Sequence, residues 1–283
     1  MPTGRWCSAK GSPYGWDRRS FCLTFDCNYS SMAKVIPLSE GSFTVDGTKE
    51  FIPFDPARDS LSARGRGSLL VEIQPFVVIT GDDYLLLDTG LGFRGPAGTL
   101  ALHQHLRDHG IEPEQINKVL LSHLHKDHAA AVTEKDPVSG IRQLSFPQAT
   151  YYVNRNELEY ALSLDGKSYH AEDFALLKDA DQVEFTGSEG EIGNHVHYEV
   201  TGGHCRYHQV FWIRDEEGTY FFGGDVAPQL SQLKNRFIAK YDEDGRKSME
   251  LRQHYKEVGA REGWVFLFYH DIGTPSIQLP QAD

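Results

Sequence analysis

The chain is predicted to fold as an α/β protein with four layers, in the order helices, sheet, sheet, helices. Short apolar segments of high β propensity recur through both halves of the 283 residues. Each half also places helical segments after its strands, and no short repeat or low-complexity segment is present. Because a sheet must cover its apolar faces, two such halves fit an α/β/β/α sandwich.

The domain organisation is predicted as an N-terminal extension followed by one folded domain. Residues 1–31 contain Pro, Gly, Ser, Arg and three cysteines without sustained periodicity, and we expect a peripheral segment. The folded domain is expected at residues 32–283, because an apolar run begins just after Met32. Two origins of the extension stay open, a natural segment and a misassigned start codon.

In the first half, the apolar segments predict an antiparallel meander. The expected strands are residues 35–38, 43–45, 68–74, 76–80 and 84–87. A helix is predicted over 97–109, ended by Gly110 as its C-cap, and a strand over 116–121. Asp127 is expected to cap a helix or turn that continues through Ala129.

In the second half, strands and helices alternate. The expected strands are residues 149–153, 183–185, 196–201, 209–214, 219–222 and 264–269, and the expected helices are 154–164, 171–177 and 245–258. The loop 51–66 and the region 158–174 are expected to shape a pocket. Arg58, Arg64 and Arg66 of that loop could bind a substrate anion, although plain surface arginines are the commoner case.

The stretch His-Leu-His-Lys-Asp-His at residues 123–128 is the strongest chemical signal in the chain. Imidazole nitrogens and carboxylate oxygens are groups that bind zinc and similar metals. A helix would send His123 and His125 to different faces, whereas the end of a strand places alternate side chains on one side. The apolar segment ending at Leu121 supplies such a strand, so we predict the core of a metal site here.

Three further segments share one layout, in which an apolar strand ends at glycine or an aromatic residue before a metal-binding side chain. These side chains are His204, Asp225 and His270. Glycine lets the backbone approach a crowded centre, and a strand end holds the side chain rigidly. Each would be a weak indication alone, but their order after residues 123–128 makes them candidates for the remaining ligands.

Other histidines are predicted to be structural. Three of them lie along the helix expected at 97–109, where isolated histidines are usually packed or solvated. His195 and His197 repeat the spacing of His123 and His125, but no acid-histidine pair follows them. A ligand role is therefore not predicted for either.

Composition excludes several kinds of partner and compartment. The net charge of −12 argues against nucleic acid, because phosphate binding needs a basic face. No apolar run approaches the roughly 20 residues that span a bilayer, and no signal peptide is evident. We therefore expect a cytoplasmic protein with a small-molecule substrate and no nucleic-acid or membrane partner. The four cysteines, including Cys205, are expected to be reduced thiols. A homodimer stays open.

With these residues the sequence resembles the metallo-β-lactamase superfamily of metal-dependent hydrolases, over roughly residues 32–283. The resemblance implies the αββα fold of that family and two metal ions. It assigns His123, His125 and His204 to the first ion, Asp127, His128 and His270 to the second, and Asp225 to a bridging position. Asp88-Thr89-Gly90 matches the family's turn after an early strand and is expected to support the site.

The implied chemistry is hydrolysis by a hydroxide that bridges two divalent ions, because such ions lower the pKa of a shared water. Zinc is the first choice, and iron or manganese also suit nitrogen and oxygen ligands. Asp127 or Asp225 would steer the proton as the tetrahedral centre collapses. Cys205 is expected to point away from the site if the backbone is extended there.

Two departures from family patterns bear on the substrate. Asp225 stands where zinc β-lactamases usually have a cysteine, so the resemblance favours the branches of lactonases, glyoxalase II, phosphodiesterases and organophosphate hydrolases. Pro228 stands where one lactonase group has a tyrosine that assists the carbonyl. That assistance is expected to be missing or to come from another residue, such as Tyr207 or Tyr269.

We therefore expect a dinuclear metal-dependent hydrolase of a small ester or lactone, similar to the lactonase and glyoxalase II branch. A phosphoester or organophosphate hydrolase is the alternative within the same chemistry. A non-catalytic binding member of the fold is the alternative from another class. It is the less favoured one, because silent members typically lose ligands and all seven ligand positions are filled here.

Overall fold

The computed structural model describes residues 33–280, apart from positions 97, 137, 165 and 167. The predicted extension at residues 1–31 lies outside this part of the chain. No helix in the described part is long and apolar enough to cross a membrane.

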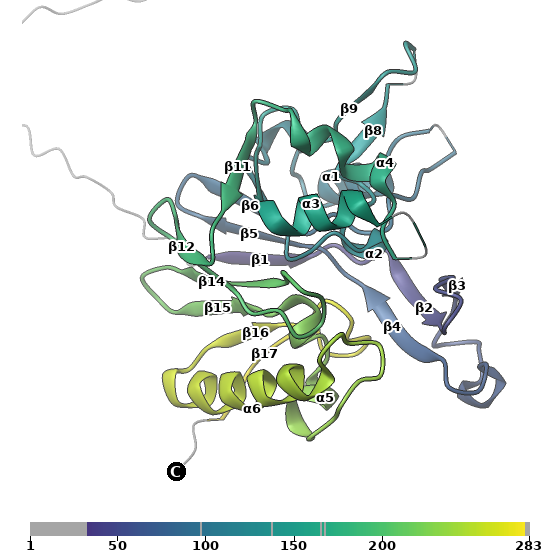
Figure 1. The fold of residues 1–283 in the computed structure, drawn as a ribbon, viewed down its shortest axis with the longest axis vertical. Helices are drawn as coiled ribbons and strands as arrows, with labels where there is room; N and C mark the ends of the chain where they lie inside the picture. Colours follow the sequence, from purple (N-terminus) through teal and green to yellow (C-terminus); the bar gives the residue numbers. More distant parts are fainter. Residues whose placement is uncertain (1–32, 97, 137, 165, 167, 281–283) are drawn as a thin grey trace, which may run out of the picture. The chain divides into compact units, whose positions relative to one another are not determined.

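Two six-stranded sheets form the central layers (Figure 1). The first contains, in spatial order, β1 (Lys34–Pro37), β5 (Phe76–Thr80), β6 (Asp83–Leu87), β7 (Lys118–Leu120), β10 (Thr150–Asn154) and β11 (Val183–Thr186). The second contains β12 (Glu189–Ile192), β13 (Val196–Val200), β14 (Gln209–Arg214), β15 (Thr219–Phe222), β16 (Val265–Leu267) and β17 (Ser276–Gln278). Both sheets are mixed, because β6, β7, β10 and β11 run parallel, as do β15 and β16.

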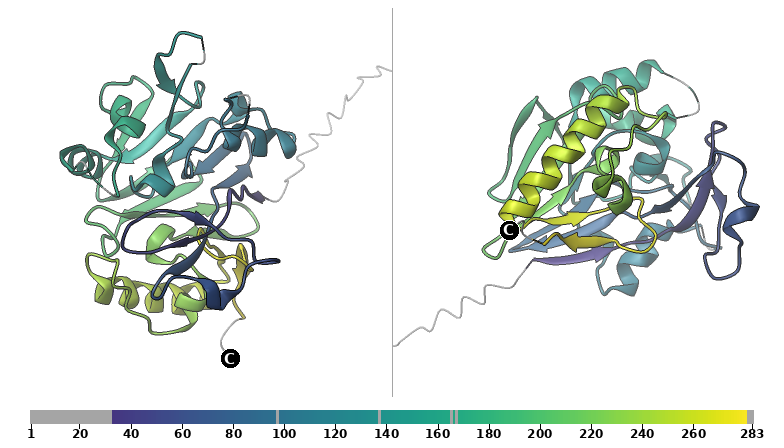
Figure 2. Two further views of the ribbon diagram at one scale, coloured as in Figure 1. Left: turned by 90° about the vertical axis from the view of Figure 1, so that its right-hand side faces the viewer. Right: turned by 90° about the horizontal axis from the view of Figure 1, so that it is seen from below.

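Two smaller sheets and the helices complete the described fold. The small sheets are β3 (Ile52–Pro53), β2 (Gly41–Val45) and β4 (Leu69–Ile73), and β8 (Thr133–Lys135) with β9 (Arg142–Leu144). The α-helices are α1 (Ala101–Asp108), α2 (Lys126–Ala129), α3 (Arg155–Ser163), α4 (Ala171–Phe174), α5 (Leu230–Lys234) and α6 (Gly245–Glu262). The 3₁₀ turns are η1 (Leu61–Ala63), η2 (Pro113–Gln115), η3 (Ala175–Lys178) and η4 (Gly224–Val226). Figure 2 shows α6 lying across the outer face of the second sheet.

Alternation of apolar side chains along the strands produces the four layers. Phe76 and Phe211 belong to the core between the two sheets, to which both sheets contribute. Val77 points the other way, into the core beneath the helices of the first half, and Trp212 packs with Tyr255 of α6. Full burial of a large apolar side chain contributes on the order of 2–3 kcal/mol, so both outer helix layers are held mainly by such contacts. The predicted four-layer fold is confirmed.

Three local predictions were wrong. The first helix begins at Ala101 and not at residue 97, and helix α5 and strands β3, β8, β9, β12 and β17 were not predicted. Each of these strands is short and mostly exposed or half-buried, so the apolar alternation that indicates a strand is weak there. His125, and not Asp127, occupies the N-cap of α2, because the side chain of Asp127 turns toward His270.

Candidate metal centre

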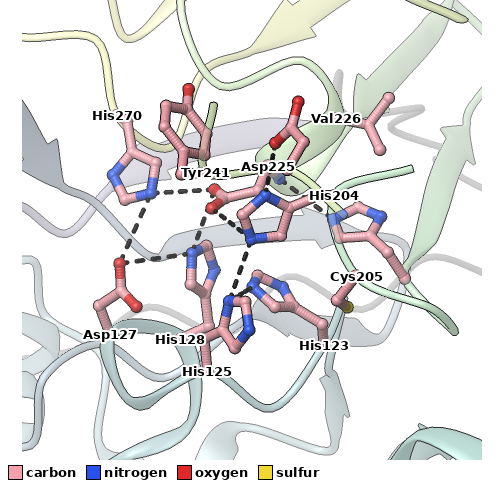
Figure 3. Close-up of polar contacts among 12 residues, drawn as sticks. His123, His125, Asp127, His128, His204, Cys205, Asp225, Val226, Tyr241 and His270 are labelled. Atoms are coloured by element: carbon pink, nitrogen blue, oxygen red, sulfur yellow. Dashed lines mark hydrogen bonds and ion pairs between the residues drawn. The ribbon is translucent and has the colours of Figure 1, made fainter. Parts of the chain in front are cut away.

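The seven predicted ligand side chains lie together at one edge of the two main sheets (Figure 3). Strand β7 ends before His123, β13 before His204, β15 before Asp225 and β16 before His270. Strands β15 and β16 are parallel, and β13 runs in the same direction because both β13 and β15 are antiparallel to β14. The carboxyl ends of these strands therefore meet at one edge, which is why residues far apart in the sequence converge.

The first cluster contains His123, His125, His204 and one oxygen of Asp225. Nδ1 of His125 lies 3.0 Å from Nε2 of His123 and 3.0 Å from Nε2 of His204. Oδ2 of Asp225 lies 3.1 Å from Nε2 of His204. The four ligand atoms all lie within 4.8 Å of one another, and the group could hold a metal ion.

The second cluster contains Asp127, His128 and His270. Nε2 of each of these histidines lies 3.7 Å from Oδ2 of Asp127. Oδ1 of Asp225 lies 3.2 Å from Nε2 of His128 and 2.9 Å from Nε2 of His270. Asp225 thus turns one oxygen to each cluster, as a carboxylate that bridges two ions would.

Four of the five histidines turn one ring nitrogen to the centre, while the other ring nitrogen makes a hydrogen bond outward. The acceptors are Asp88 for His128 (2.8 Å), Asp242 for His204 (2.9 Å), the backbone oxygen of Glu72 for His270 (2.7 Å) and Ser122 Oγ for His123 (3.0 Å). Carboxylates and carbonyls only accept, and the Ser122 hydroxyl donates to Asp88, so these partners hold the proton on the outer nitrogen.

Asp88 contacts His128 of the second cluster and Ser122, the neighbour of His123 in the first. Its carboxylate accepts hydrogen bonds from the backbone N–H of Ser122 (2.7 Å), the Ser122 hydroxyl (2.7 Å) and Nδ1 of His128 (2.8 Å). Its φ is 57°, a left-handed conformation that is costly for a residue with a side chain and persists where surrounding contacts determine it. The turn Asp88-Thr89-Gly90, which was expected to support the site, therefore lies beside the metal centre.

The donor set fits divalent cations. Nε2 of His128 and Oδ1 of Asp225 are buried and make no hydrogen bond, although they lie 3.2 Å apart. Burial acts to lower the pKa of His128, but the charges of Asp225 and Asp127 raise it well above its usual value. Burial acts to raise the pKa of Asp225, but His270, His128 and His204 hold it well below its usual range. The centre therefore favours added positive charge, which metal ions would supply.

Glu157 of α3 is a buried carboxylate beneath the first cluster. Its Oε1 accepts hydrogen bonds from the backbone N–H of Leu124 (3.1 Å) and from the hydroxyl of Tyr169 (3.2 Å). The thiol of Cys205 lies 3.7 Å from both carboxylate oxygens. Burial raises the pKa of the Cys205 thiol, which keeps it protonated and unsuited to nucleophilic attack.

The side chain of Tyr269 contacts two of the predicted ligands, Asp127 and His128. Its hydroxyl donates a 2.6 Å hydrogen bond to the backbone oxygen of Asp127, and its ring stacks on His128 with centroids 4.1 Å apart. Tyr269 therefore positions two predicted ligands and is not free to assist a carbonyl. The ring of Tyr207 packs against Tyr160, with centroids 6.1 Å apart.

A cavity of about 820 Å³ lies beside the first cluster. His125 and His204 form part of its wall, and a smaller cavity of about 70 Å³ continues to Asp127, Asp225 and His270. The region 158–174 lines the large cavity as predicted, through Tyr160, Leu164, Gly166, Ser168 and Tyr169. The loop 51–66 supplies only Phe51 to the small cavity, so its expected role was largely wrong.

The arginines of that loop lie elsewhere on the surface. Arg58 pairs with Asp55, and Arg64 donates to the backbone oxygen of Leu61. Neither of them, nor Arg66, lines the large or the small cavity in the part of the chain that the structure describes. The turn that follows β2, residues 45–49, lines both cavities in their place.

Sequence reasoning missed several residues that support the centre. Asp242 lies in the segment before α6, whose backbone N–H groups at Glu243 and Asp244 also bind the oxygens of His204 and Gly203. The ring of His208 accepts the backbone N–H of Asp225 at 3.1 Å. The only available signals were the acidic run before α6 and a histidine four residues after His204, and neither is specific.

Comparison with known proteins identifies a family and a shared fold. The sequence profile described as Metallo-beta-lactamase superfamily matches residues 71–270. The N-acyl homoserine lactonase AttM of Azorhizobium caulinodans is 27% identical over 170 residues, which is 54% of this chain and 58% of that protein. The chain thus matches a little more than half the length of this relative.

Solved structures share the fold. A probable metal-dependent hydrolase from Staphylococcus aureus superposes with a TM-score of 0.71 at 19% identity, covering 88% of this chain and 93% of that chain. AidC, a dizinc quorum-quenching lactonase in complex with the product N-hexanoyl-L-homoserine, superposes with a TM-score of 0.63 at 16% identity, covering 89% and 95%. At these identities the likeness is one of fold.

Proposed function

Because the chain belongs to the metallo-beta-lactamase superfamily and is a metal-dependent hydrolase, we propose that it cleaves a small ester or lactone at a centre of two divalent ions. Zinc is the ion expected first, with iron or manganese as alternatives for the same nitrogen and oxygen ligands. The proposal includes the seven ligand positions, His123, His125, Asp127, His128, His204, Asp225 and His270.

The position of Asp225 is the observation that carries the proposal. Its two oxygens lie 3.1 Å from Nε2 of His204 on one side and 2.9 Å from Nε2 of His270 on the other. A carboxylate with imidazoles on both sides suits two ions that share it, as in two-metal hydrolytic sites with ions about 3.5–4 Å apart. With a single ion, one of the two ligand clusters would hold no metal.

The chain's own residues hold the ligands and handle the proton. Two bound ions would lower the pKa of a shared water and polarise the substrate carbonyl. Asp88 and Asp242 orient the imidazoles of His128 and His204, and they would hold the proton on the outer nitrogen when the inner nitrogen binds an ion. Asp127 is the more exposed of the two acidic ligands, with 14% of its side chain accessible against 9% for Asp225. It is therefore better placed to pass a proton to the departing alkoxide.

The adjoining cavity supports a substrate with an apolar part. Its volume of about 820 Å³ falls within the range of small-molecule sites. Leu164, Phe237 and Ile238 on its wall are 38%, 41% and 51% exposed, so a bound apolar group would remove them from water. The lactonase activity named for AttM and AidC favours a lactone among the candidate substrates.

The proposal is tested by metal analysis and a substrate panel. The purified protein is expected to hold about two divalent ions per chain by plasma mass spectrometry, and fewer than one after mild purification would overturn the dinuclear centre. Initial rates on 4-nitrophenyl acetate, a γ-lactone and bis-4-nitrophenyl phosphate then compare the three candidate bonds. Faster turnover of the phosphodiester than of both carbonyl substrates would replace the ester or lactone assignment.

A further inference from the structure

Three lysines line the two cavities beside the metal centre. Lys49 lines both the large and the small cavity, Lys126 lines the small one and Lys240 the large one. Their ammonium groups come from three separate segments, the turn after β2, the first turn of α2 and the segment before α6. The fold therefore brings three positive charges to two adjoining cavities in a chain whose net charge is −12.

None of the three has an ion pair with a carboxylate in the described part of the chain, where the pairs found involve other residues. Asp46 and Glu243 share the large cavity with Lys49 and Lys240, and the predicted ligands Asp127 and Asp225 share the small one with Lys49 and Lys126. Asp46 accepts the backbone N–H and hydroxyl of Thr48, and Glu243 accepts the hydroxyl of Tyr160 at 3.3 Å. Acidic residues outnumber basic ones by 40 to 28, so three lysines without an ion pair on the walls of two adjoining cavities are unexpected on a purely structural account. Lys126 Nζ lies over the ring of Phe51, 5.7 Å from its centroid.

The backbone at Lys49 adds an independent observation. Its φ is 63°, and in the described chain only Lys49 and Asp88 combine a side chain with a left-handed conformation. The turn is closed by the 3.0 Å hydrogen bond from the N–H of Lys49 to the oxygen of Asp46. Glycine would adopt this conformation without steric cost, whereas lysine does not. A lysine here is half-buried against the metal centre in a strained conformation, as side chains at ligand sites often are.

We propose that Lys49, flanked by Lys126 and Lys240, forms an anion-binding subsite that selects esters or lactones carrying a carboxylate away from the scissile bond. An ammonium is a compact charge with three donors, and the mostly apolar wall around it strengthens its attraction for a carboxylate. The carboxylate would lie against Lys49 while the carbonyl faces the two clusters. This proposal rests on the proposed function and specifies its substrate class.

The test uses matched substrates that differ only in charge. One pair is 4-acetoxybenzoate and 4-acetoxybenzamide, and the other is 5-oxotetrahydrofuran-2-carboxylate and its carboxamide. The metal-loaded full-length protein is expected to show a higher kcat/KM for the carboxylate of each pair it hydrolyses. The ratio is expected to fall roughly tenfold in Lys49→Gly and to be largely kept in Lys49→Arg. Lys49→Asn tolerates the same backbone and is expected to repeat the loss if the glycine variant folds poorly.

Lys178→Gln is the matched control, because Lys178 is an exposed lysine on η3 outside both cavities. It lowers the net charge equally and is expected to keep the wild-type ratio. Raising the salt concentration should reduce the ratio in the wild type but hardly in Lys49→Gly. Equal ratios in wild type and both neutral Lys49 variants would overturn the subsite while leaving the proposed function intact. Turnover of none of the four compounds by the metal-loaded wild type would instead overturn the proposed function.

Discussion

The backbone N–H of Leu124 donates a 3.1 Å hydrogen bond to the carboxylate of Glu157, 33 residues further along the chain. Leu124 lies between two predicted ligands, His123 and His125, so this bond holds the backbone from which both side chains project. The same carboxylate receives the hydroxyl of Tyr169, whose ring lies 4.7 Å from that of His125. Glu157 therefore acts on the metal centre by positioning and not by contact with a substrate.

Replacing Glu157 with glutamine should lower both stability and metal affinity. The site offers three donors to the carboxylate, from Leu124, Tyr169 and Cys205, and the amide group of glutamine would oppose one of them. Leaving such buried groups unpaired costs about 1–3 kcal/mol in the free energy of unfolding. Urea denaturation and metal titration measure the two effects. Glu159→Gln, an exposed change on the same helix, should alter stability by less than about 0.5 kcal/mol. Equal behaviour of the two variants would contradict the positioning role.

Asp242→Asn should weaken metal binding without unfolding the protein. The buried carboxylate of Asp242 accepts the Nδ1 proton of His204 at 2.9 Å, and an amide would orient the imidazole less firmly and lower its basicity. Loss of such a partner typically costs about 10–100-fold in metal affinity or activity. Competition with a chromogenic chelator gives the affinity, and Asp181→Asn on the surface serves as the control. Unchanged affinity in Asp242→Asn would mean that His204 is oriented by other contacts.

His123→Ala should remove hydrolysis and reduce the metal content from two ions per chain toward one. His123 contributes Nε2 to the first cluster and is fully buried, so the second cluster can keep its own ion. A loss of activity of at least about 100-fold is expected, because a ligand of a catalytic metal is removed. His197→Ala is the matched control, since His197 belongs to a similar His-x-His pair but contacts Glu191 on the second sheet. Circular dichroism would verify that both variants stay folded, and a fully active His123→Ala would refute the assignment.

Stability should depend on the ionisation of Glu40. The residue is half-buried but its Oε1 is fully enclosed, and burial raises the pKa to about 7 although the N–H of Leu91 opposes the shift. A folded pKa above the unfolded value of 4.5 stabilises the fold at low pH. This contribution is complete below pH 4.5 and is lost as the pH rises through 7.

The corresponding experiment compares wild type with Glu40→Gln, which cannot ionise. Between pH 5 and pH 8 the difference in unfolding free energy should change by about 2–3 kcal/mol in favour of the glutamine variant. Urea denaturation of the metal-free proteins at both pH values measures it, because metal binding has its own pH dependence. A difference that does not change with pH would show that Glu40 ionises normally.

The metal ligands could be predicted from the sequence because each follows a local rule. His123 and His125 alternate at the end of an apolar strand, and His204 and Asp225 follow glycine pairs at the ends of others. Period-two alternation and glycine before a crowded centre are visible in a few neighbouring residues. The four layers were predictable for the same reason, since the long strands alternate between two apolar cores.

The partners behind the ligands could not be predicted in this way. Asp242 meets His204 across 38 residues and Glu157 meets Leu124 across 33, and neither acidic residue belongs to a pattern that distinguishes it from surface carboxylates. The placement of Asp127 in the first turn of α2 was also missed. Its side chain turns toward the ligands of the second cluster, and the N-cap position lies two residues earlier, at His125.

By itself, the sequence determined the fold class, the family and the set of candidate ligands, because these depend on periodicity and on chemistry that short segments carry. Only the tertiary structure decided that one oxygen of Asp225 faces each cluster, and which partner holds each imidazole. It also decided that Lys49, Lys126 and Lys240 line the two cavities beside the metal centre. Such relations depend on the directions of strands and turns that are distant in sequence, and side chains meet there only once the sheets have packed.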